Sequence, residues 1–145
     1  MWSGATHCGA STERARAKGK YLFLKEFCFD KRPADLKLVF ENSMSRVFVF
    51  EDGRLVGVGR ALADGRDCSY LCDIAVLPDQ QGRGLGKEIV DRLVRLSAGH
   101  RKIILYSVPG REPFYEAFGF RRMMTAMAIF EDPAKALRNG YLQRV

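Results

Sequence analysis

A strand that leads through a glycine-rich loop into an amphipathic helix constrains this chain more than any other feature. The apolar run Ile74-Ala75-Val76 continues through Pro78 to the sequence QQGRGLG at residues 80–86. Apolar residues then recur at helical spacing over residues 85–96, and Gly99 ends the predicted helix. A strand that is apolar on both faces is typical of the centre of a sheet. The chain is therefore expected to build a layered α/β fold around this unit.

The rest of the chain supplies short elements on both sides of this unit. Asp52-Gly53 lies between two apolar runs, as in a tight hairpin, and Asp64-Gly65 marks a second turn. The expected elements are a helix from Pro33 to Asn42, strands over 47–50, 55–58 and 70–77, a helix over 85–96, a strand over 102–106, a short helix over 113–118, a strand over 120–130 and a terminal helix from Asp132. Residues 20–29 fit either a helix or a buried strand. We expect a loose N-terminal tail over residues 1–19 and a single domain over residues 20–145.

The composition is that of one packed domain. The chain has 145 residues, of which 47% are hydrophobic and 28% charged. It therefore has enough apolar residues to form one hydrophobic core, and disorder of the whole chain is excluded. No apolar run approaches the roughly 18 residues that a membrane span needs. The first 20 residues lack the apolar block of a secretory signal. We therefore expect no membrane partner.

Charge and cysteine usage exclude further classes. Lys and Arg number 24 against 17 Asp and Glu, a net charge of +7, but the cations are scattered and no helix carries a basic stripe. This distribution favours a site for an anionic ligand over a nucleic-acid surface. The four cysteines form no CxxC pair, and His7 and His100 are both far in sequence from Cys68 and Cys72, so no metal site is expected. Reduced thiols predict a cytoplasmic location.

The glycine-rich loop has the features of an anion site. Gly82, Gly84 and Gly86 allow positive φ and close approach of a ligand to the backbone, and the helix that follows points its N-terminal amides at the same place. Arg83 and Lys87 add positive charge. The loop matches neither the P-loop nor the GxGxxG dinucleotide fingerprint, because the required glycine positions hold Gln81 and Lys87.

The spacing that fits is Gln81-x-x-Gly84-x-Gly86. It resembles the acetyl-CoA-binding motif, Arg/Gln-x-x-Gly-x-Gly/Ala, of the GNAT superfamily of N-acetyltransferases. Three other segments are similar to that family: DIAVLPDQ at 73–80 resembles its fourth strand, IILYSVPG at 103–110 its fifth strand, and PFYEAFGF at 113–120 its late FYxxxGF segment. The resemblance spans about residues 46–130. It implies a mixed, mostly antiparallel central sheet flanked by helices, within a single domain.

The resemblance also implies acetyl-CoA as the donor, with CoA as a product. Backbone groups of the fourth-strand segment would pair with the pantetheine arm, the glycine-rich loop would hold the pyrophosphate, and a serine after the fifth strand would touch the cofactor. These cofactor-binding residues are Ile74, Ala75, Val76, Gln81, Gly82, Arg83, Gly84, Leu85, Gly86, Lys87 and Ser107.

The expected catalytic groups are a proton donor and a base. Tyr115 matches the family's general acid, which protonates the leaving thiolate; packing on the neighbouring aromatic side chains is the alternative role. Asp73 is a candidate base, although in a regular strand it points to the opposite face from Tyr70 and Cys72, and only a bulge would change this. An ordered water is an equal alternative to Asp73. The substrate side is expected to include Tyr70, Cys72, Asn42 and Ser43.

The function implied is an acyltransferase that moves an acetyl group from acetyl-CoA to a primary amine of a small molecule by direct attack on the thioester. Two alternatives stay open: a catalytically weak acetyl-CoA-binding regulatory module, and a protein N-acetyltransferase. Met123, Met124 and Met127 suit either a flexible core or the surface of a homodimer.

Overall fold

Tight turns fold the first strands into an antiparallel meander. The computed structural model describes residues 31–144. The elements of its first compact unit, which ends at Ile104, are α2 (Pro33–Glu41), β1 (Ser45–Glu51), β2 (Arg54–Ala63), β3 (Cys68–Val76), the 3₁₀ turn η2 (Pro78–Gln80), α3 (Leu85–Leu96) and β4 (Lys102–Ile104). Asp52 and Gly53 have φ of 49° and 79°, as a two-residue hairpin turn requires.

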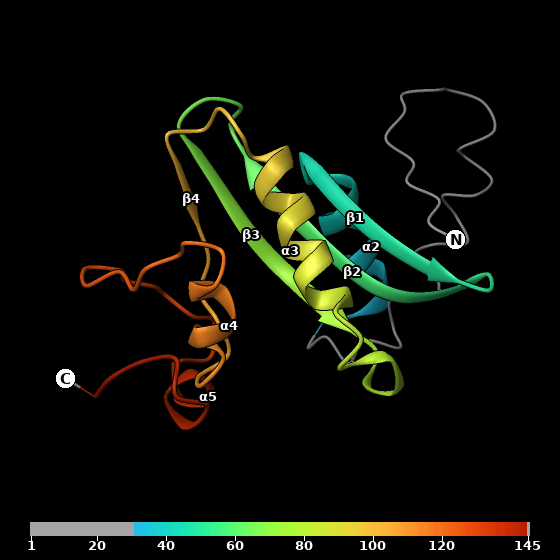
Figure 1. The fold of residues 1–145 in the computed structure, drawn as a ribbon. Helices are drawn as coiled ribbons and strands as arrows, with labels where there is room; N and C mark the ends of the chain where they lie inside the picture. Colours follow the sequence, from blue (N-terminus) through green and yellow to red (C-terminus); the bar gives the residue numbers. More distant parts are fainter. Residues whose placement is uncertain (1–30, 145) are drawn as a thin grey trace. The chain divides into compact units, whose positions relative to one another are not determined.

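The four strands form one sheet in the order β1-β2-β3-β4 (Figure 1). The pairs β1–β2 and β2–β3 are antiparallel, and β3–β4 is parallel. The expected mixed, mostly antiparallel sheet is therefore confirmed, as is the α/β class. The helix over 85–96 also begins and ends as predicted, whereas β4 ends two residues earlier than expected.

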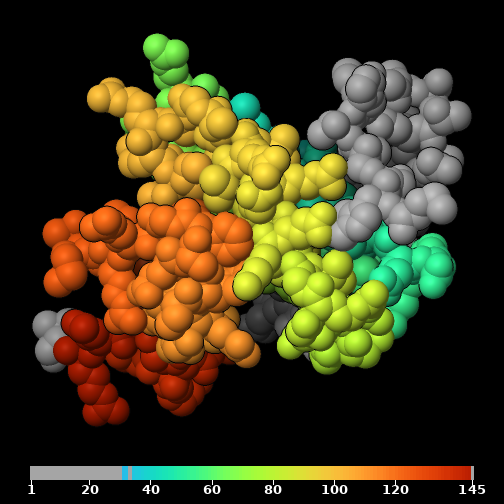
Figure 2. Space-filling view, viewed as in Figure 1, coloured from blue at the N-terminus to red at the C-terminus, as the bar shows by residue number. Residues whose placement is uncertain are grey.

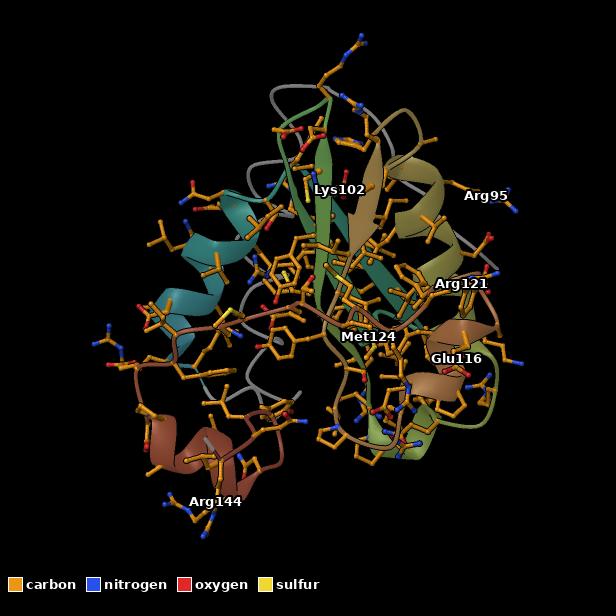
Figure 3. All side chains as sticks on the ribbon, turned by 90° about the vertical axis from the view of Figure 1, so that its left-hand side faces the viewer. Arg95, Lys102, Glu116, Arg121, Met124 and Arg144 are labelled. Carbon is orange, nitrogen blue, oxygen red and sulfur yellow. The ribbon has the colours of Figure 1, made fainter. Side chains whose placement is uncertain are left out.

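The helices α2 and α3 lie on opposite faces of the sheet (Figure 3). On one face, Val58 of β2 packs in a buried cluster with Phe40 of α2. On the other face, a Cβ atom added to Gly59 would lie 2.7 Å from Ile89 Cγ2 and 2.9 Å from Leu93 Cδ1. Glycine in β2 therefore lets α3 approach the sheet more closely than a side chain would allow.

Residues 105–144 form a second compact unit with two short helices, α4 (Glu112–Glu116) and α5 (Pro133–Arg138). The predicted terminal helix is confirmed, and Asp132 caps it by accepting a hydrogen bond from the Lys135 amide at 2.8 Å. The predicted strand over 120–130 is wrong, because these residues form no regular element. A strand needs a hydrogen-bonded partner, and the described part of this unit contains no other strand.

Two expectations are not decided by these residues. The tail over 1–19 and the ambiguous segment 20–29 lie outside the described part of the chain, so the tail and the single domain over 20–145 stay predictions. Among the helices of residues 31–144, none is long and apolar enough to cross a membrane.

Candidate active site

The loop between β3 and α3 leaves open space above its glycines. Gly82 and Gly84 have φ of 79° and 85°, and Gly84 is the N-cap of α3. Within residues 31–144, a Cβ atom at either position would meet no heavy atom within 4 Å. These glycines are therefore required by backbone conformation rather than by packing within the protein. The loop can accept an anionic group against its amides and the positive end of the α3 dipole.

Side chains of the loop are tied to the strands beside it. Gln81 Nε2 donates a hydrogen bond to the Val76 carbonyl at 3.1 Å, which fixes the exit of the chain from β3. Lys87, in the first turn of α3, is exposed. Leu85 is buried and anchors the first turn of α3 in the core. The glycine-rich loop, which we call the cradle, is therefore joined to a well-packed helix.

Two crossed ion pairs join this loop to the β1–β2 hairpin. Arg83 Nη1 lies 2.7 Å from Glu51 Oε2, and Arg54 Nη1 lies 2.7 Å from Asp79 Oδ2. The Arg83 guanidinium holds the pKa of Glu51 below its usual range, and Arg54 does the same for Asp79. Figure 2 shows the loop at the surface beside the hairpin tip. We name Glu51, Arg54, Asp79 and Arg83 the hairpin clamp.

The strands β3 and β4 pair over only three residues. The pairing ends at Tyr70 and Ile104, whereas β3 continues to Val76 (Figure 1). From Leu71 onward, β4 supplies no partner to that edge of β3. The predicted cofactor residues Ile74, Ala75 and Val76 lie on this stretch. Of their backbone groups, those that point away from β2 lie at this edge, where a ligand can pair as a strand does, although the Val76 carbonyl already accepts a hydrogen bond from Gln81.

A β-bulge in β3 changes the direction of Asp73. The register passes from Val58–Ala75 to Arg60–Cys72, so Asp73 and Ile74 together face a single residue of β2. Asp73 has φ of 49°, one of two non-glycine residues in the described chain with positive φ. Its carboxylate consequently contacts Arg60, which lies opposite Cys72. The face expected for a regular strand is therefore wrong for Asp73.

The Asp73 carboxylate is held by two cations. Arg60 Nε donates to Oδ2 at 2.6 Å, and Lys31 Nζ donates to Oδ1 at 2.6 Å. The Arg60 and Asp73 side chains are only 8% and 11% exposed, whereas Lys31 is 33% exposed. Both oxygens thus accept charge-assisted hydrogen bonds, which fix the carboxylate in place.

The end of α2 completes this group. Ser43 is buried, donates to the Val39 carbonyl at 2.6 Å and accepts from Arg60 Nη1 at 3.2 Å. The Arg60 guanidinium also lies 5.8 Å from the centre of the Phe40 ring. The predicted substrate-side residue Ser43 is therefore brought to Asp73 through Arg60. Asn42 is the exposed C-cap of α2.

Cys72 and Tyr70 lie half-buried on the same face of the sheet as Arg60, because Cys72 is opposite Arg60 and Tyr70 is opposite Leu62 in the ladder. Burial raises the pKa of the Cys72 thiol to about 11. Cys72 is thus a protonated thiol at neutral pH and not a thiolate nucleophile.

Tyr115 lies in α4, within the second unit. Its ring makes edge-on contacts with Phe114, at 5.0 Å between centroids, and with Phe120, at 6.2 Å. Burial raises the pKa of its hydroxyl above the usual value. The predicted Ser107 is half-buried in the same unit. The hydroxyl of Tyr115 therefore stays protonated at neutral pH, as a proton donor must.

Comparison with known proteins decides the family. The model of the acetyltransferase (GNAT) family matches residues 13–120. The chain belongs to the GNAT acetyltransferase family. The resemblance drawn from the sequence is thereby confirmed.

Individual relatives agree with this family. An uncharacterized ycf52-like N-acetyltransferase of Prochlorococcus marinus is 30% identical over 104 residues, which cover 67% of this chain and 58% of that protein. A probable acetyltransferase from meticillin-resistant Staphylococcus aureus has a TM-score of 0.69 at 20% identity, with 80% of this chain and 92% of that chain covered. A predicted acetyltransferase from Clostridium acetobutylicum, solved with acetyl-CoA, has a TM-score of 0.63 at 16% identity, with coverage of 79% and 91%. At these identities the solved structures show the shared fold.

Three parts of the candidate site were not predicted from the sequence. Arg60 interrupts the apolar run of β2, and a charge in a buried strand is a signal that a partner lies nearby. Glu51 and Arg54 flank the predicted hairpin turn, but their partners are fixed only by the fold. Lys31 gives no signal in the sequence, since it contacts a residue 42 positions away.

Proposed function

We propose that this GNAT protein is an acetyl-CoA-dependent N-acetyltransferase that acts on a primary amine of a small molecule. The observation that carries the proposal is the open loop between β3 and α3. Gly82 and Gly84 have positive φ, no heavy atom of the described residues lies within 4 Å of a Cβ atom built on either, and the N-terminus of α3 faces the same place. A pyrophosphate is the group that such a cradle fits best.

Residues of the chain bind the donor at two places. The backbone around Gly82 and Gly84, with Gln81, Leu85, Gly86 and Lys87, holds the pyrophosphate. The open edge of β3 at Ile74–Val76 orients the pantetheine arm, and Ser107 is a further contact. Acetyl-CoA supplies an acetyl group activated as a thioester. Arg83 reaches the pyrophosphate only by leaving Glu51, so its contribution is smaller than that of the backbone amides.

The proposed reaction needs two proton transfers, one to the leaving thiolate and one from the acceptor amine. The Tyr115 hydroxyl gives its proton to the departing thiolate, and its raised pKa keeps that proton available at neutral pH. Both oxygens of Asp73 are engaged by cations in the protein alone. We therefore assign the removal of the proton from the acceptor amine to water. Cys72 remains a thiol and takes no acetyl group, which favours direct transfer between donor and acceptor.

The test combines cofactor binding with turnover. Calorimetry measures the affinity for acetyl-CoA, and thiol release is followed across amino sugars, polyamines and arylalkylamines. We expect micromolar binding and CoA release that depends on the amine, with N-acetylated product found by mass spectrometry. Tight binding without amine-dependent release from any small amine would replace this proposal with a regulatory module or an enzyme that acetylates proteins.

A further inference from the structure

A primary amine of the protein itself sits beside the bulge of β3. Lys31 Nζ lies 2.6 Å from Asp73 Oδ1, and 42 positions separate the two residues in sequence. A lysine side chain is chemically a butylammonium group. The carboxylate therefore already binds the functional group that an amine acceptor would bring.

The carboxylate is fixed independently of Lys31. Arg60 binds the other oxygen, Oδ2, at 2.6 Å and is itself held by Ser43 and by the Phe40 ring. These contacts set the position of Asp73 whether or not Oδ1 has a partner. Oδ1 is thus a preformed binding point for one further cation.

The two cations differ in how easily they leave. The Arg60 side chain is 8% exposed, so its removal from Asp73 would leave a buried charge uncompensated. The Lys31 side chain is 33% exposed and can regain water on leaving. Exchange at the carboxylate therefore takes place at Oδ1, and Lys31 is the group displaced.

Asp73 also stands where an acceptor is needed. It directly precedes Ile74–Val76, the stretch of β3 that has no partner from β4 and that the proposed function assigns to the donor. The bulge turns its carboxylate to the face that carries Arg60 and Cys72. An ammonium bound at Oδ1 would lie at the bulge, next to the edge of β3 that we propose pairs with the pantetheine arm of acetyl-CoA.

We propose that Asp73 Oδ1 is the docking point for the ammonium of the acceptor, and that Lys31 occupies it when no acceptor is bound. This inference rests on the proposed function and adds a substrate class to it: alkyl amines that are cations when they bind. Lys31 is then an internal competitor that raises the amine concentration needed for half-maximal rate. Asp73 is a binding residue for the acceptor and releases it to water for deprotonation.

The first test uses n-butylamine, which copies the Lys31 side chain, and measures binding through the amide NMR signals of Asp73 and Ile74 without turnover. We expect Lys31→Ala to bind butylammonium about tenfold more tightly than the unmodified protein, because the competitor is gone. Lys31→Arg keeps a cation at Oδ1 and should bind as weakly as the unmodified protein. Lys37→Ala, which removes a lysine paired with Glu41 on α2, is the matched control. The neutral isostere n-butanol should not bind to any of these proteins.

Equal butylammonium affinity in the unmodified protein and in Lys31→Ala would overturn the inference, as would NMR shifts confined to other residues. Asp73→Asn should abolish binding; if that variant does not fold, the Lys31 pair decides the question, since it leaves Arg60 and Asp73 intact.

The second test is kinetic. With the best amine of the panel, KM should fall about three- to tenfold in Lys31→Ala and stay high in Lys31→Arg. An unchanged KM in Lys31→Ala overturns the inference while the proposed function stands. Absence of amine-dependent CoA release from the unmodified protein overturns the proposed function, and the acceptor role with it, whereas the butylammonium titration still reports whether Lys31 covers a cation site.

Discussion

The proposed role of Tyr115 as a proton donor can be tested most directly. Replacing it with Phe removes one oxygen and keeps the ring that contacts Phe114 and Phe120. If its hydroxyl protonates the thiolate, kcat for Tyr115→Phe should fall about 10²- to 10⁴-fold with acetyl-CoA affinity almost unchanged. Tyr141→Phe is the control, because Tyr141 packs against Phe130 within the same unit. A Tyr115→Phe enzyme with unimpaired kcat, when chemistry limits the rate, would leave solvent as the proton source.

The pH profile of the same enzyme follows from the pKa of Tyr115. Burial disfavours the phenolate, so the folded protein keeps this proton to a higher pH than an exposed tyrosine, whose pKa is about 10. The rate should therefore persist through neutral pH and decline only above about pH 10. The decline should be absent from the residual rate of Tyr115→Phe. A decline at the same pH in both enzymes would assign it to another group.

A substitution at Gly84 tests whether the glycine-rich loop binds the pyrophosphate. A side chain there meets open space in the part of the chain that the structure describes, but it would occupy the place proposed for the pyrophosphate. We expect Gly84→Val to fold, at a cost of about 1–2 kcal/mol for positive φ, and to lose at least tenfold in CoA affinity by calorimetry. Gly99→Val is matched to it: φ is 93°, the surrounding space is equally open, and it follows the opposite end of α3. Equal CoA affinity in the two variants would remove the loop from the site.

At the scale of elements, the hairpin clamp couples β1–β2 to the glycine-rich loop. The ion pair with Glu51 holds Arg83 away from an anionic ligand, so Glu51→Gln should release it. We expect Glu51→Gln to tighten CoA binding about two- to fivefold at low salt, and the gain should vanish in the double variant with Arg83→Ala. Weaker CoA binding by Glu51→Gln would instead mean that the clamp holds the loop in its binding conformation.

Elements with local signals were predicted well. The hairpin at Asp52-Gly53 and the helix over 85–96 depend on turn chemistry and spacing that the sequence shows directly. The strand over 120–130 failed because a strand depends on a partner elsewhere in the chain. The direction of Asp73 failed for a related reason: a bulge adds one residue to β3 and reverses the alternation that the sequence pattern implies. The positive φ expected at Gly82 and Gly84 was predictable because it follows from loop chemistry, whereas Gly86 lies within α3 and has no positive φ. The partners of Arg60 and Lys31 are set only by folding.

At the scale of the molecule, the stability of the sheet depends on how closely α3 approaches it. A methyl group at Gly59 would meet both Ile89 and Leu93, whereas one at Gly57 would meet chiefly the tip of Ile89, at 2.9 Å. We expect Gly59→Ala to lower the free energy of unfolding by about 1–3 kcal/mol, and Gly57→Ala to lower it less, in urea titrations. Identical losses would show that α3 shifts as a rigid body to accommodate either methyl group.

The early end of the β3–β4 pairing should appear as an alternation in the hydrogen–deuterium exchange rates of successive backbone amides. In an antiparallel pair, alternate amides point away from the partner strand, so on either side of the bulge at Asp73–Ile74 about every second amide of residues 71–76 faces the edge that β4 leaves open. In deuterated water those amides should exchange quickly, while the amides between them, bonded to β2, exchange slowly. If the pantetheine arm pairs with this edge, CoA should slow only the fast-exchanging amides, so that the difference between the two groups becomes smaller. Uniform protection by CoA, or no protection, would mean that the pantetheine arm lies elsewhere.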